Sequence, residues 1–194
     1  MKFIERPSGC FCDRASLEPN LAKIDIMMTT LDAENYLERS LFTLYREVPV
    51  RNLIICDGGS MDTTLEIIKK FPRVKLHVRP DLTTEGKSME FLINELETEW
   101  CVYLDGDIEL AEGWYDTMCL QKDKFDVIEN GKVYLAWHKY ILSEDKLKSN
   151  TRPLTDCHLF KKEALKDFHV DDDFAWRHDD ILFRQTAERS GFKY

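Results

Sequence analysis

Residues 100–110 have the sequence WCVYLDGDIEL, an apolar run followed at once by two aspartates with a glycine between them. The run predicts a strand that is covered on both faces. Side chains two positions apart on a strand point to the same side, so Asp105 and Asp107 can converge on one cation. Gly106 has no side chain, and a ligand can therefore approach the backbone. A polar turn after a core strand is the plain alternative, and other segments must decide between the two interpretations.

Upstream of this stretch, apolar runs alternate with amphipathic segments. Strands are expected at residues 24–28, 53–56, 74–78 and 100–104. Helices are expected between them, at residues 34–47, after residue 60 and at residues 87–96. This order predicts a single α/β domain with a mostly parallel central sheet flanked by helices.

A second acidic motif, DGGSMDTT at residues 57–64, follows the second expected strand. Asp57 at the strand end can accept hydrogen bonds from a base or a ribose, and the two glycines permit a tight turn. The alternative is a glycine-rich turn that caps the next helix. Ligands of parallel sheets bind beyond the carboxyl ends of the strands, where both acidic motifs fall. The Rossmann fingerprint and the Walker A pattern are absent from the sequence.

The second half of the chain is less regular. Residues 127–128 and 133–137 are expected to form a hairpin around Asn130-Gly131. Another strand is expected at residues 156–160, and a helix at residues 179–190 that Gly191 closes. Residues 1–22 show no clear period, and we expect an extension of unknown role before a domain at residues 23–194.

Composition excludes several classes of function. The net charge of −9 disfavours a nucleic-acid groove, which needs clustered Lys and Arg. No run approaches the length of a membrane span, and the first residues, MKFIERPSGC, lack the apolar region of a secretory signal. The six cysteines lack the spacing of common zinc motifs. We expect six free thiols in a reducing compartment and therefore a cytoplasmic protein.

Several segments together resemble the motifs of family 2 glycosyltransferases of the GT-A type. DGGSMDTT is similar to the family's DDGSTDGT or DGGSTDGT motif, and VYLDGDIEL resembles the strand that ends in its Asp-x-Asp metal motif. The family's opening strand and helix are similar to MMTTLDAENYLERSL in this chain. The family's Gly-Lys segment and the helix before its metal strand are similar to EGKSMEFLIN. AEGW is similar to the Pro-Gly-Trp turn, and HDDILFRQTAERSGF to the helix that carries the general base. The resemblance spans about residues 23–192, with Thr29, Ala33 and Gly58 departing from the usual residues.

The resemblance implies an inverting transfer of a sugar from a nucleotide-diphosphate sugar, such as a UDP- or GDP-sugar, to a saccharide or lipid-linked acceptor. It implies Mn²⁺ or Mg²⁺ as cofactor, with Asp107 and Asp105 as metal ligands. Asp180 aligns as the base, or Asp179 if the register is one residue different. Residues 23–110 would bind the donor and residues 111–194 the acceptor. The residues implied to bind the nucleotide sugar are Thr30, Asp32, Asp57, Gly58, Lys87, Asp105 and Gly106.

Two other functions compete with this interpretation. A sugar-nucleotide nucleotidyltransferase usually carries glycine and basic residues directly after the first strand, where this chain has TTLDAEN. A catalytically degenerate domain that only binds a nucleotide sugar is the second alternative, because the opening motif is changed.

Overall fold

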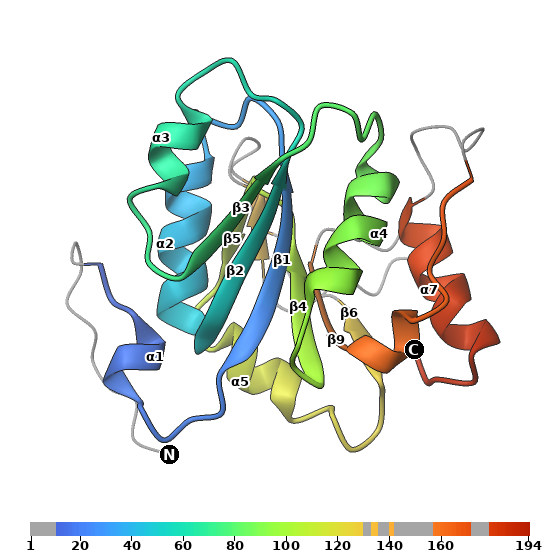
Figure 1. Cartoon of the computed structure of the whole chain (residues 1–194). Coiled ribbons are helices and arrows are strands. Elements are labelled where there is room, and N and C mark those ends of the chain that lie inside the picture. Colours follow the sequence, from blue (N-terminus) through green and yellow to red (C-terminus); the bar gives the residue numbers. More distant parts are fainter. Residues whose placement is uncertain (1–10, 130–132, 136–139, 142–156, 172–178) are drawn as a thin grey trace.

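A computed structural model describes residues 11–129, 133–135, 140–141, 157–171 and 179–194, of which residues 133–135, 140–141 and 179–181 are described by their backbone alone. The central sheet has six strands in the order β3-β2-β1-β4-β9-β6 (Figure 1). Four of them are mutually parallel: β1 (Ile24–Thr30), β2 (Val50–Asp57), β3 (Val74–Val78) and β4 (Trp100–Leu104). β9 (Cys157–Lys161) runs antiparallel to both β4 and β6 (Val127–Glu129). The predicted α/β fold with a mostly parallel sheet is confirmed.

Helices cover both faces of the sheet, because side chains along each strand alternate between them. In β1, Ile26 and Met28 belong to one apolar cluster, whereas Met27 belongs to the other. The first cluster includes side chains of α2 (Leu37–Glu47), α3 (Thr64–Ile68) and α5 (Trp114–Cys119). The second includes those of α4 (Glu85–Glu95) and α7 (Asp179–Arg189) (Figure 1). None of the described helices is both long and apolar enough to cross a bilayer.

The predicted hairpin around Asn130-Gly131 is wrong. β6 pairs with β9 in the central sheet, with Val127 opposite Phe160 and Ile128 opposite Leu159. The next strand, β7 (Val133–Leu135), instead joins β5 (Ile108–Leu110) and β8 (Tyr140–Ile141) in a separate antiparallel sheet. Val127 and Ile128 are buried, so the packing of β6 against the core overrides the local turn signal.

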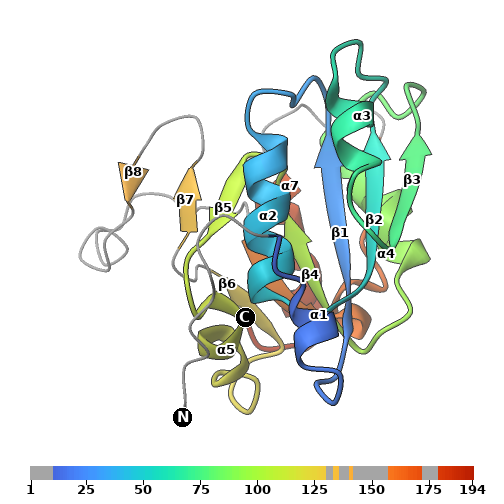
Figure 2. The ribbon, with the colours of Figure 1, turned by 90° about the vertical axis from the view of Figure 1, so that its left-hand side faces the viewer.

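The N-terminal segment is fastened to the domain from residue 11 onward. It contains the short helix α1 (Arg14–Leu17), which contacts α2 (Figure 2). Asp13 accepts two hydrogen bonds from the Arg73 guanidinium, at 2.7 and 2.9 Å. The buried Arg14 donates to the backbone oxygen of Glu47 and forms an ion pair with Asp116, both at 2.7 Å. The chain also contains the 3-10 helix η1 (Lys162–Leu165) after β9.

His158 lies in the apolar core and titrates far from its usual range. It is only 1% exposed and stacks on Phe183 with a centroid distance of 4.5 Å. Its Nε2 atom lies 3.1 Å from the Tyr194 hydroxyl and 3.9 Å from Glu129, yet burial lowers the pKa of His158 to about 3. The imidazole is therefore neutral near pH 7.

The buried His158 should make the free energy of unfolding depend on pH. The pKa rises to about 6.5 on unfolding, so the free energy of unfolding is highest above pH 6.5 and falls as the pH drops toward 3. We expect a loss of about 1 kcal/mol per pH unit from this residue. Urea unfolding of wild type and His158→Phe between pH 7 and 4.5 measures it. The exposed-site variant His169→Gln should keep the wild-type slope, and an equally steep slope in His158→Phe would contradict the assignment.

Candidate functional site

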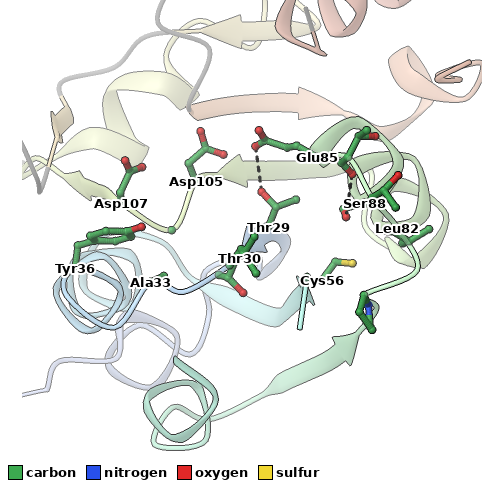
Figure 3. A pocket seen from close by; sticks show the side chains of 16 residues that line it. Thr29, Thr30, Ala33, Tyr36, Cys56, Leu82, Glu85, Ser88, Asp105 and Asp107 are labelled. Carbon is green, nitrogen blue, oxygen red and sulfur yellow. Dashed lines mark hydrogen bonds between the residues drawn. The ribbon is translucent and has the colours of Figure 1, made fainter. Parts of the chain in front are cut away.

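A cavity of about 500 Å³ opens beyond the carboxyl ends of β1, β2 and β4 (Figure 3). Its polar walls include Thr30, Tyr36, Glu85, Asp105 and Asp107. Apolar side chains complete it, among them Leu31, Pro80 and Leu82. Parallel β1, β2 and β4 end at the same edge of the sheet, so three separate chain segments contribute to one cavity.

The turn after β4 brings two carboxylates to the cavity wall. Asp105 and Asp107 are half-buried, and the Asp105 carbonyl accepts a hydrogen bond from the Ile108 N–H at 3.2 Å. Gly106 between them is buried against β1, where a Cβ atom would lie 3.3 Å from Thr30 Cγ2. The glycine therefore permits the close packing of this turn on the end of β1.

The carboxylate of Asp57 stabilises the neighbouring turn. It is fully buried, and its carboxylate accepts hydrogen bonds from the Thr30 hydroxyl at 2.8 Å and from the Gly59 N–H at 2.9 Å. The Ser60 N–H and hydroxyl donate to it at 2.7 and 2.6 Å. Gly59 has a φ of +97°, a conformation that favours glycine. These contacts fix the ends of β1 and β2 beside each other.

Replacing Asp57 by Ala should destabilise the whole fold. The buried Thr30 hydroxyl and the N–H groups of Gly59 and Ser60 would lose their acceptor. We expect the free energy of unfolding to fall by about 2–4 kcal/mol, as for other buried polar networks. Urea unfolding measures this, with the exposed Asp123→Ala as a control that should change little. Wild-type stability in Asp57→Ala would show that these contacts contribute nothing to the fold.

The structure brings together part of the predicted set. Thr30, Gly58, Asp105, Gly106 and Asp107 line the cavity. The other members are not among the lining residues, or their side chains lie outside the described part of the chain.

Asp57 is buried and is not among the lining residues, and neither Asp32 nor Lys87 is among them. Asp32 is exposed and accepts a hydrogen bond from the Met61 N–H at 2.8 Å. Lys87 is half-buried in the first turn of α4. The helix α7 begins at Asp179, as predicted, but the side chains of Asp179 and Asp180 lie outside the described residues.

Several polar residues of the cavity were given no role from the sequence, Tyr36 and Glu85 among them. Tyr36 precedes α2 and Glu85 opens α4, so both lie inside segments that the sequence comparison had singled out, but neither was assigned a role. Burial and the nearby carboxylates of Asp107, Asp62 and Asp32 raise the pKa of Tyr36. Its hydroxyl therefore keeps its proton at neutral pH and can act as a donor toward the cavity (Figure 3).

The pair of carboxylates suits a hard divalent cation that takes its remaining ligands from a substrate. Mg²⁺ is usually bound by one or two carboxylates together with phosphate oxygens and water. Among the residues that the structure describes, no group of three His, Cys, Asp or Glu side chains is placed to hold a metal. Asp105 and Asp107 would thus form a site that is complete only with a bound phosphate ligand.

Comparison with protein families yields a match over most of the chain. The model of glycosyl transferase family 2 matches residues 25–175. A comparison with curated proteins finds no match.

Solved structures share the fold at low sequence identity. Residues 1–349 of S. aureus TarS superpose with a TM-score of 0.67 and 18% identity, over 86% of this chain and 55% of that chain. Glucosyl-3-phosphoglycerate synthase from Mycobacterium tuberculosis, in complex with Mn²⁺, UDP and phosphoglyceric acid, gives a TM-score of 0.61 and 17% identity, over 95% of this chain and 70% of that chain. The chain thus spans about half the length of the TarS fragment.

Proposed function

This chain belongs to glycosyl transferase family 2, and from that premise we propose that it transfers a sugar from a nucleotide-diphosphate sugar to an acceptor hydroxyl. The transfer proceeds with inversion at the anomeric carbon and with the help of Mn²⁺ or Mg²⁺. The observation that carries this proposal is the cavity in which Asp105 and Asp107 meet beyond the carboxyl ends of β1, β2 and β4. Open parallel sheets bind their ligands at this edge.

A UDP-sugar is the first donor to test, with a GDP-sugar as the second. TarS has been crystallised in complex with UDP-GlcNAc, and the mycobacterial synthase in complex with UDP. The cavity volume of about 500 Å³ lies within the usual range for small-molecule sites. Apolar Leu31, Pro80 and Leu82 would shield the base from water.

Asp105 and Asp107 would hold the metal ion, with Asp107 the more direct ligand. The chemistry of these residues fits, since carboxylates, phosphate oxygens and water form the usual surroundings of Mg²⁺. A metal bound there would neutralise charge on the departing nucleoside diphosphate. The positive charge of the metal matters because the chain itself has a net charge of −9. The mycobacterial synthase was crystallised with Mn²⁺.

The chain's own residues would orient the donor around that centre. Tyr36 keeps its hydroxyl proton and can donate to a phosphate or sugar oxygen. Thr30 holds its position through its hydrogen bond to Asp57, which would act by positioning the turn that carries Gly58. Lys87 and Asp32 would contribute from the edges of the site.

Asp180 would act as the general base that takes the proton of the acceptor hydroxyl. An ionised carboxylate suits this role near pH 7 without a large shift of its pKa. Its place on α7 supports the proposal, because the resemblance puts the general base of the family on this helix. Asp179 would support it or, with the other register, replace it.

The acceptor is a saccharide or a lipid-linked saccharide, bound by residues 111–194, while residues 23–110 bind the donor. We place the reaction in the cytoplasm. The five described cysteines, Cys12, Cys56, Cys101, Cys119 and Cys157, are free thiols, which suits a reducing compartment.

A screen of UDP- and GDP-sugars with Mn²⁺, Mg²⁺ or chelator tests the proposal. We expect a donor to raise the unfolding temperature only with metal, and slow hydrolysis of the same donor to follow. Metal-dependent binding without hydrolysis or transfer to any saccharide would instead indicate a catalytically degenerate binding domain. Release of pyrophosphate from a nucleotide triphosphate and a sugar phosphate would indicate a nucleotidyltransferase.

A further inference from the structure

Glu85 and Asp105 are linked by one buried hydroxyl group. The Tyr103 hydroxyl donates to Glu85 Oε1 at 2.7 Å and also contacts Asp105 Oδ1. The Thr29 hydroxyl donates to the same Glu85 oxygen at 3.1 Å. Glu85 is itself exposed and lines the cavity, whereas Tyr103 is only 3% exposed. Two strands, β1 and β4, therefore fix a carboxylate that belongs to α4.

One oxygen of Glu85 remains available to a ligand. Both hydroxyl donors reach Oε1, and within the described part of the chain no donor is recorded for Oε2. The Tyr103 hydroxyl lies between the two side chains, because it donates to Glu85 and also contacts Asp105. It has only one proton to share between two carboxylates. Glu85 can thus accept further hydrogen bonds from hydroxyl groups of a ligand through Oε2.

The place of Glu85 along the cavity indicates which part of a donor faces it. Figure 3 shows Glu85 between Asp105 on one side and Ser88 and Leu82 on the other. In a nucleoside diphosphate, the ribose lies between the base and the phosphates. With the diphosphate at Asp105 and Asp107 and the base against Leu82, the ribose lies opposite Glu85.

We propose that Glu85, beside Asp105, binds the 2′,3′-diol of the donor ribose and is a specificity-determining residue for ribonucleotide donors. The proposal rests on the proposed function, since it requires a nucleotide in this cavity. Two carboxylates that contact one hydroxyl oxygen are close neighbours, which suits the adjacent hydroxyls of a diol.

Charge supports this choice of ligand group. A carboxylate repels phosphate but accepts strong, charge-assisted hydrogen bonds from hydroxyls. Glu85 therefore favours the neutral, hydroxylated part of the donor over its diphosphate. The two hydroxyl donors on Oε1 also hold the side chain in place before a ligand arrives, which lowers the entropy lost on binding.

The test compares UDP with 2′-deoxy-UDP and 3′-deoxy-UDP by calorimetry in Mn²⁺, and GDP with its deoxy forms. Wild type should bind the ribonucleotide about tenfold to a hundredfold more tightly than at least one deoxy form, as expected for a hydrogen bond to a charged group. Glu85→Gln keeps an acceptor for Thr29 and Tyr103 but removes the charge. We expect it, and Glu85→Ala, to reduce this preference to about threefold or less.

Glu95→Gln is the matched control, because Glu95 ends α4 and does not line the cavity. It should keep the wild-type preference. If both Glu85 variants keep that preference while nucleotide binding stays metal-dependent, the inference is overturned and the proposed function stands. If wild type binds neither UDP nor GDP in Mn²⁺, the proposed function fails and the inference fails with it.

Discussion

Asp107→Asn should lose most of the gain in nucleotide affinity that Mn²⁺ gives to the wild-type protein. The substitution keeps the size of the side chain but removes the charge of one of the two carboxylates that the turn after β4 contributes to the described cavity lining. Changes to residues that merely support a metal ligand typically cost tenfold to a hundredfold in affinity. We therefore expect a loss of about a hundredfold or more in Mn²⁺-dependent affinity for UDP. Calorimetry of UDP binding, in Mn²⁺ and in chelator, measures it.

The residual affinity in chelator separates loss of metal from loss of fold. It should be the same in Asp107→Asn and wild type, because the base and ribose contacts remain. Asp123→Asn, an exposed carboxylate outside the cavity lining, should behave as wild type in both buffers. Equal affinity of the wild-type protein in Mn²⁺ and in chelator would rule out metal-assisted donor binding at Asp107.

The parallel sheet could be predicted because its strands are short apolar runs covered on both faces. In β2, the five consecutive residues from Leu53 to Asp57 are all buried, which no half-exposed strand would produce. The position of the site followed from the same pattern. Thr30 and Asp57 end neighbouring parallel strands in direct register, and Asp105 follows the strand on the other side of β1.

Contacts between distant segments could not be predicted. Nothing in the run LIICDGGS at residues 53–60 distinguishes an aspartate that binds a ligand from one whose carboxylate is buried. The carboxylate of Asp57 is buried and accepts four hydrogen bonds. The link from Glu85 through Tyr103 to Asp105 depends on how α4 meets β4, which only the packed fold determines. The prediction of a hairpin was wrong for the same reason, because the strand that pairs with β6 is β9, which lies far along the chain.

Asp180→Asn should nearly abolish turnover while leaving donor affinity close to that of wild type. As the general base, Asp180 would act on the acceptor hydroxyl and not on the nucleotide, so the amide would remove proton transfer alone. General bases contribute about a hundredfold to ten-thousandfold, and we expect turnover to fall by at least a hundredfold. Initial rates of sugar transfer and calorimetry of donor binding measure the two effects separately.

The competing explanation is that the two acids only cap α7. Acidic side chains at a helix N-terminus stabilise the helix by about 0.3–1 kcal/mol through its dipole, which requires no cleft and no acceptor. Both Asp179→Asn and Asp180→Asn would then lower the unfolding temperature slightly and leave turnover intact, since α7 is held by Phe183 and Ala187 in the core. If Asp179→Asn has no turnover while Asp180→Asn keeps it, the general base is Asp179. Two active variants would place the base elsewhere, because a carboxylate that takes the acceptor proton cannot be replaced by an amide at full rate.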